Sequence, residues 1–171
     1  GEGYTSREFN RGKTFEGAVE VHPLAAMDQL RPLGVFASYI AGSTGTSLAR
    51  ANRLTTGLLW QGERVRGGVF FTHGWGVAQL GTQRAILASA FVRVEPIKRL
   101  LLGARLDHVV RDVEIEPNDF LTTVWGTAGY RVALPVETFL ALSRSIPTSR
   151  AQSELPGSNA WDMRLILRVV F

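Results

Sequence analysis

The sequence predicts an all-β fold, a transmembrane antiparallel up-and-down β-barrel, from three observations. Apolar and polar residues alternate along stretches of about nine to fifteen residues, as in strands with one apolar and one polar face. No window of the chain approaches the ~20 apolar residues that a spanning helix needs. Short and long connections follow each other in turn, which is typical of membrane barrels with tight turns on one side and longer loops on the other.

Residues 161–171 show the alternation most clearly. Their odd positions are apolar and their even positions include one aspartate and two arginines, so a strand there has one apolar and one charged face. Trp161 and Phe171 stand at the two ends of the apolar row, which suits rings at the two interfaces of a membrane. This stretch resembles the C-terminal recognition strand of Gram-negative outer-membrane barrels. The alternative is an edge strand of a soluble β-sandwich.

The N-terminal part is expected to hold a polar segment and four strands. Residues 1–13 are polar and rich in glycine, and we expect an extracellular loop or N-terminal segment there, with the barrel over residues 14–171. The strands are expected at 14–22, 33–41, 53–61 and 65–77. In each of them Val, Leu, Phe or Trp recurs at alternate positions. Pro23 closes the first strand, 24–32 is a long connector, and 42–47 is expected to be a flexible loop.

Five further strands are expected in the rest of the chain. They lie at 84–94, 99–110, 120–134, 136–146 and 161–171. Tight turns are expected at 95–98 and at Pro135, and longer loops at 111–119, which is acidic, and at 147–160. In outer-membrane barrels the tight turns lie in the periplasm, and this alternation therefore places the C-terminus there.

The expected total of nine strands is odd. Bacterial single-chain barrels have even strand numbers, and in lipid the hydrogen-bonding groups of every strand edge must be paired. We therefore expect the chain to be the C-terminal part of a longer barrel. The alternative is an eight-stranded barrel of residues 33–171, with residues 1–32 as a periplasmic or plugging extension.

Three stretches resemble the outer-membrane porin family that includes the phosphate- and pyrophosphate-selective porins. They are KTFEG (13–17) through LGVFASY (33–39), LGARLDH (102–108) followed by Asn118 and Asp119, and the terminal hairpin with 163–171. The resemblance implies a barrel of sixteen or more strands with an anion-passing lumen, working as a trimer. The chain has two lysines, Lys13 and Lys98, so the family's lysine-rich phosphate ladder has no counterpart here.

In each expected strand the positions that alternate with the apolar ones form a polar face, which we call the polar parity. Basic side chains outnumber acidic ones on that face. The residues expected to line a pore are Arg53, Arg66, Arg93, Arg105, Arg131, Arg164 and Arg168, and Arg99 shares their parity. The acidic residues of that parity are Glu16, Glu20, Asp107, Glu137 and Asp162. Rings of arginine bias a water-filled pore toward anions. Alternatively, these arginines pair with the carboxylates and hold the wall rigid, as Arg105 would with Asp107 and Arg164 with Asp162.

Aromatic residues near strand ends recur on the apolar parity. The residues expected at the membrane interfaces are Trp60, Trp75, Tyr130, Trp161 and Phe171. Rings of this kind place their apolar bodies in lipid and their polar edges near water.

No catalytic or metal site is expected, and neither is a cofactor. Cysteine is absent, and His22, His73 and His108 are separated by whole hairpins, without the spacing of metal ligands. Ser89 and Ser143 fall on the polar parity, but no histidine on an adjoining strand completes a catalytic pair with them. The net charge of +4 comes from arginines scattered singly, so nucleic acid is not an expected partner.

The function expected is that of an outer-membrane porin, or the C-terminal part of one, through which small polar solutes diffuse with a bias toward anions. Its partners would be membrane lipid, small anions or polar solutes, and further copies of the chain or other outer-membrane subunits. One alternative is a small structural or scaffold barrel that holds partner proteins on its outer wall or loops. Another is an outer-membrane hydrolase.

Overall fold

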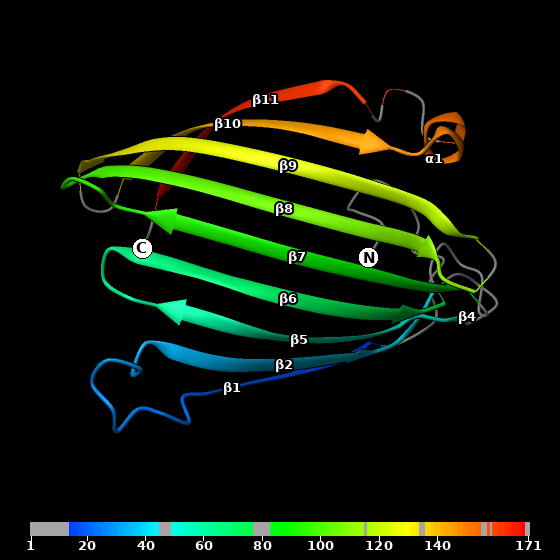
Figure 1. Cartoon of the computed structure of the whole chain (residues 1–171), viewed down its shortest axis with the longest axis horizontal. Coiled ribbons are helices and arrows are strands. Elements are labelled where there is room, and N and C mark those ends of the chain that lie inside the picture. The colour runs from blue at the N-terminus through cyan, green and yellow to red at the C-terminus, as the bar shows by residue number, and fades with distance from the viewer. Residues whose placement is uncertain are drawn as a thin grey trace.

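The computed structural model describes residues 14–44, 49–76, 83–114, 116–133, 136–154, 157 and 159–169, and one antiparallel β-sheet dominates it (Figure 1). Its nine strands are β1 (Phe15–Val21), β2 (Leu33–Ala41), β5 (Asn52–Gln61), β6 (Val65–Trp75), β7 (Arg84–Val94), β8 (Leu100–Asp112), β9 (Glu116–Ala133), β10 (Val136–Pro147) and β11 (Trp161–Val169). Three small elements accompany the sheet: β3 (Ser43–Thr44), β4 (Ala49–Arg50) and the helix α1 (Ser149–Glu154).

Strands that neighbour each other in this sheet also follow each other along the chain. The order is β1-β2-β5-β6-β7-β8-β9-β10-β11, and every neighbouring pair is antiparallel. In Figure 1 the β5–β6 and β7–β8 turns lie at one end of the sheet, whereas β4 and α1 lie at the other. The predicted all-β, up-and-down arrangement of nine strands is therefore confirmed, as one open sheet with β1 and β11 at its edges.

The predicted strand bounds agree closely with the observed ones. The ranges 33–41 and 84–94 match β2 and β7 at both ends. The largest difference is at the start of β9, which begins at Glu116 rather than at residue 120. Residues 77, 134, 170 and 171, which close three of the predicted strands, lie outside the described residues.

The predicted long acidic loop over 111–119 is wrong. β8 continues to Asp112, β9 begins at Glu116, and these two residues face each other in the register. Arg111 Nη2 donates to Asp119 Oδ2 at 2.6 Å and thereby ties the two strand extensions together. The polarity that indicated a loop reflects a cross-strand ion pair instead.

Two other expected loops contain regular structure. β3 lies within 42–47 and pairs with β4 as a small second sheet. α1 lies within 147–160, and Thr148 Oγ1 accepts a hydrogen bond from the Ala151 amide at 3.3 Å, as a helix N-cap does. The same hydroxyl donates to Asp119 Oδ1 at 3.1 Å, so this carboxylate fastens α1 to β9.

The two faces of the nine-stranded sheet differ in composition. On one of them, which we call the apolar face, large hydrophobic side chains are exposed in every strand. They include Phe15, Val19, Val35, Tyr39, Leu54, Leu58, Val69, Phe71, Val92, Leu102, Leu106, Val124, Tyr130, Leu140, Leu142, Met163, Leu165 and Leu167. Among the described residues, the buried hydrophobic side chains are Leu101, Ala141 and Ala151. The hydrophobic side chains of the sheet therefore lie mainly on its surface rather than in a core.

β1 is a full member of this sheet. It pairs with β2 from Phe15 opposite Ala41 to Val21 opposite Val35. The alternative that set residues 1–32 apart from an eight-stranded barrel therefore does not describe the observed sheet. No helix among the described residues has the length and hydrophobicity needed to cross a membrane.

Candidate functional site

All seven arginines that the sequence analysis selected lie on the face opposite the apolar one. Strand register fixes this, because residues that face each other across neighbouring strands point to the same side. Arg66 faces Arg93, and Glu137 faces both Arg131 and Arg168. We call this surface the arginine face, defined by Arg53, Arg66, Arg93, Arg105, Arg131, Arg164 and Arg168.

The sheet curves around the arginine face. Arg93 Nη2 of β7 lies 3.4 Å from Glu137 Oε1 of β10, although β8 and β9 run between these two strands. Arg93 shares a register row with Ala141 of β10, and Glu137 is four residues further along that strand. In a flat sheet the Cα atoms of Arg93 and Glu137 would therefore be ~20 Å apart, at ~4.8 Å per strand and ~3.4 Å per residue, beyond the reach of the two side chains. Curvature toward this side brings the two side chains together, so the arginine face is concave.

We call the end of the sheet with the β5–β6 and β7–β8 turns the turn end, and the end with β4 and α1 the loop end. Glu137 is the centre of an ion-pair cluster near the turn end. Its side chain is 9% exposed and accepts from Arg131 Nε at 3.2 Å, and Arg168 Nη1 lies 3.7 Å from its second oxygen. Arg93 adds a third cation and also lies over the Phe139 ring at 5.6 Å. Three arginines around one carboxylate leave positive charge in excess, and each of them also ties β10 to another strand.

The β7–β8 turn adds a second carboxylate to this cluster. Arg99, which was expected to begin a strand, has φ 76° and lies in the turn, where its amide donates to Glu95 Oε1 at 2.9 Å. This hydrogen bond lowers the pKa of Glu95 against the opposing effect of desolvation, and the nearby charges of Arg131, Arg93 and Arg64 also lower it. Glu95 therefore stays ionised at neutral pH and lies 3.5 Å from Arg131 Nη1.

A second cluster lies further along β7 and β8. Arg105 Nε donates to both oxygens of Asp107, at 2.9 and 2.8 Å, and Ser89 Oγ donates to the same carboxylate. On β11, Arg164 pairs with Asp162. The pairing expected between arginines and carboxylates two positions apart is therefore confirmed at both sites.

Arg53 and Arg66 differ from the other arginines of this face. Both side chains are exposed, and neither makes an ion pair with any other described residue. Arg66 also faces Arg93 directly, a like-charge arrangement that is unfavourable unless an anion or water screens it. Arg53 and Arg66 thus present uncompensated positive charge to solvent.

Four of the five aromatic residues expected at membrane interfaces lie on the apolar face, and Phe171 is outside the described residues. Trp60 and Tyr130 lie near the turn end of the sheet, whereas Trp75 and Trp161 lie near the loop end. Trp75 stacks on His73 with ring centroids 4.3 Å apart, and the Arg144 guanidinium lies 5.4 Å from the Trp161 ring. The apolar face therefore has aromatic residues at both of its ends.

The three histidines and Ser89 lie in different surroundings. His73 and His108 lie on the apolar face, where His108 Nδ1 is 2.9 Å from Thr122 Oγ1. His22 contacts Glu20 at 3.0 Å, and Ser89 bonds to Asp107 rather than to a histidine. The described part of the chain has no group of three or more His, Asp or Glu side chains placed to hold a metal ion.

Sequence reasoning missed a row of phenylalanine rings on the arginine face. Phe70 lies 5.8 Å from Phe36 and 6.0 Å from Phe91, measured between ring centroids. A side chain added at Gly57 would overlap Phe70, and one added at Gly129 would overlap Phe139, so these rings lie flat against the backbone of the neighbouring strand. The sequence signal for these rings is a phenylalanine on the polar face of one strand with a glycine opposite it on the neighbouring strand, as for Phe70 with Gly57 and Phe139 with Gly129.

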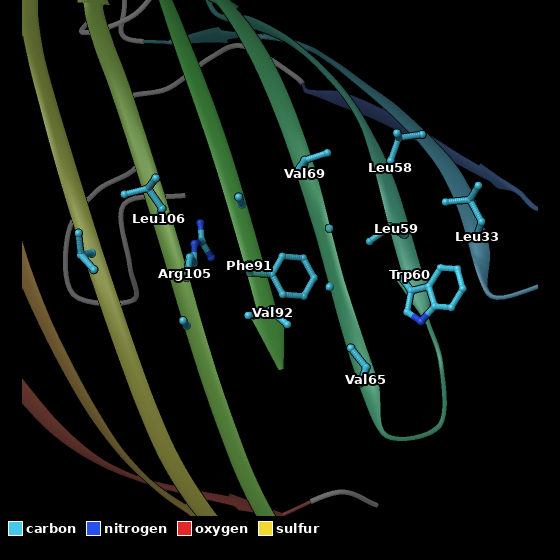
Figure 2. A pocket seen from close by; sticks show the side chains of 15 residues that line it. Leu33, Leu58, Leu59, Trp60, Val65, Val69, Phe91, Val92, Arg105 and Leu106 are labelled. Atoms are coloured by element: carbon cyan, nitrogen blue, oxygen red, sulfur yellow. The ribbon is translucent and has the colours of Figure 1, made fainter. Parts of the chain in front are cut away.

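The apolar face carries a depression of about 570 Å³ (Figure 2). Gly67, which has no side chain, and Ala90 and Ala104, which have small ones, line it among larger neighbours such as Trp60 and Leu106. In Figure 2 the labelled side chains come from β2, β5, β6, β7 and β8. Gly67 and Ala104 lie in one register row on either side of Val92, and Ala90 lies in the next row, so small residues on three strands leave this space open.

The fold and these faces define an all-β protein whose main sheet has one apolar face and one concave, arginine-bearing face. No family model and no curated protein sequence matches the chain.

Proposed function

We propose that the chain is the C-terminal part of an outer-membrane porin, whose water-filled lumen passes small polar solutes with a bias toward anions. The observation that carries the proposal is the opposite chemistry of the two faces. Large hydrophobic side chains are exposed on one side, and arginines lie on the concave other side. A transmembrane barrel has this arrangement because its outer surface meets lipid and its lumen meets water.

The apolar face supports a membrane location. Leu165 is 82% exposed, and similar side chains continue across all nine strands. In water a contiguous apolar surface of this extent would be unfavourable by ~25 cal/mol per Å², whereas in lipid that cost disappears. The aromatic residues near both ends of the face are placed as the interfacial belts of such barrels are.

The two edges of the sheet support a larger barrel. β1 and β11 each have one neighbour within the described part of the chain, and nine strands are an odd number. In lipid, unpaired backbone groups cost several kcal/mol each, so further strands would have to pair with both edges. The resemblance to the phosphate- and pyrophosphate-selective porins favours a barrel of sixteen or more strands, assembled as a trimer.

The charges of the arginine face support an anion bias. Its seven arginines exceed the carboxylates Glu16, Glu20, Asp107, Glu137 and Asp162 of the same face, and Arg53 and Arg66 are not neutralised by any described carboxylate. Fixed positive charge on a low-dielectric wall attracts passing anions and repels cations.

The test is a reversal-potential measurement in a planar bilayer, using the intact protein with all the strands of its barrel. Under a potassium chloride gradient we expect chloride to be more permeant than potassium, and the preference to weaken in 1 M salt, where the Debye length is about 3 Å. A preference for potassium would contradict the anion bias.

A scaffold barrel is the second candidate, and the filling of the arginine face favours it. Ion pairs tie β10 to β7, β9 and β11, and the Phe36, Phe70 and Phe91 rings cover part of the same surface. A lumen filled in this way would conduct no ions. Absence of any conductance in the bilayer experiment would therefore support the scaffold over the porin.

A further inference from the structure

A pocket of about 490 Å³ lies on the arginine face over β7, β8 and β9. Phe91, Arg105 and Trp125 form one row across these strands, since Arg105 faces both aromatic residues in the register. The next row contains Gly103 and Thr127, which also line the pocket. Aromatic, cationic and hydroxyl groups thus surround one position that has no side chain.

Gly103 makes the floor of this pocket. A side chain at this position would overlap Thr127 Oγ1, so the hydroxyl of Thr127 already occupies the adjoining space. β7 and β9 lie about 10 Å apart on the two sides of β8, at ~4.8 Å per strand. In the register Gly103 lies between Arg93 and Thr127, and Phe91 and Trp125 flank it one row further along β7 and β9, so a planar ring over Gly103 would approach both aromatic side chains diagonally.

The charged groups of the pocket favour a single negative charge. Arg93 pairs with Glu137 and Arg105 pairs with Asp107, so the donors left open to a solute are the terminal nitrogens of Arg105. Arg105 donates to Asp107 through Nε, its side chain is 54% exposed, and its two terminal nitrogens donate to no other described group. Those terminal N–H groups have the fork geometry that binds a carboxylate.

Trp125 adds an unused donor. Its indole Nε1 is buried and has no hydrogen-bond partner among the described residues. Protein atoms cover this nitrogen, so a solute in the pocket would reach it only after the ring shifts.

We infer that this pocket binds a small aromatic carboxylate, whose ring lies over Gly103 between Phe91 and Trp125 and whose carboxylate meets the terminal nitrogens of Arg105. The inference rests on the proposed function, because it names a solute class for that pore. The two aromatic walls select a ring over an aliphatic chain, and the two terminal nitrogens of the one arginine with open donors match one carboxylate.

The experiment measures benzoate binding to the intact protein in detergent by isothermal titration calorimetry, with acetate and benzyl alcohol as probes that lack the ring or the charge. We expect benzoate to bind at least about tenfold more tightly than either probe, because acetate lacks the stacking ring and benzyl alcohol lacks the charged hydrogen bond. Equal binding of acetate and benzoate would overturn the inference.

Two variants with matched controls locate the site. Arg105→Gln should weaken benzoate binding at least about tenfold, whereas Arg144→Gln, the same charge change on the apolar face, should leave it unchanged. Phe91→Leu should weaken it about three- to tenfold through loss of the ring, whereas Phe36→Leu, outside the pocket, should not. Equal losses in the variants and in their controls would place the binding elsewhere and refute the site.

The outcomes separate this inference from the proposed pore. Anion-biased conductance without benzoate binding would overturn the site and leave the porin standing. Benzoate binding that depends on Arg105 and Phe91, in a protein without conductance, would support the site and contradict the porin.

Discussion

Arg131 and Glu137 face each other across β9 and β10, and Arg131 Nε donates to Glu137 Oε1 at 3.2 Å. Because Glu137 is buried and also contacts Arg93 and Arg168, Glu137→Gln leaves three arginines without their shared carboxylate. We expect the free energy of unfolding to fall by about 1–3 kcal/mol. The measurement is urea unfolding in detergent or bilayers. The control Glu16→Gln changes an exposed carboxylate on β1 and should cost less than about 0.5 kcal/mol.

The assignment of the two faces is tested on β11 by a pair of neighbouring substitutions. Leu167→Arg on the apolar face should lower the free energy of unfolding in bilayers by about 2–4 kcal/mol, because it places a charge in lipid. Ile166→Arg adds the same charge on the arginine face and should cost little, because that side chain would meet water. If both variants fold equally well, the assignment of lipid and lumen faces fails.

The two unpaired arginines provide a test of ion preference that leaves the ion pairs intact. The double variant Arg53→Glu/Arg66→Glu should reduce the ratio of chloride to potassium permeability by about half or more, because it reverses exposed charge on the concave face. Arg144→Glu on the apolar face serves as the control and should leave the ratio unchanged. A ratio that does not respond to the double variant would show that these side chains are not near the ion path.

The lowered pKa of Glu95 predicts a dependence of stability on acid pH. The pKa is lowered from an ordinary value of 4.5, so the stabilisation by this carboxylate is fully present above that pH. It is lost as pH falls below that value and through the folded-state pKa. We therefore expect wild type to be more stable than Glu95→Gln at pH 7, and the difference to disappear in acid. Urea unfolding at a series of pH values measures this, and a difference that stayed constant with pH would contradict it.

Most of the sheet could be predicted because period-two alternation is a local signal. In β2, Val35 and Tyr39 share one face and Phe36 the other, and no distant contact is needed to see it. The elements that were missed depend on contacts across the chain. The extensions of β8 and β9 rest on the pair of Arg111 with Asp119, and α1 is held to β9 by the hydrogen bond from Thr148 to the same Asp119.

The candidate site was predictable in part. The alternation of apolar and polar residues within β8 and within β9 was enough to place Arg105 and Trp125 on one surface, because it needs no knowledge of distant contacts. The proximity of Arg93 to Glu137 could not be predicted, because it depends on curvature across four strands. The packing of Phe70 over Gly57 depends on cross-strand register, which the alternation within one strand leaves open.

The order of the strands also bears on how this protein assembles and diversifies. Because every pairing in the large sheet joins consecutive members of that sheet, each hairpin can form before the next one is added, and few contacts wait for distant parts of the chain. A hairpin could equally be duplicated or deleted without rethreading any other strand. The sheet would then change by two strands while every remaining side chain stayed on the same face.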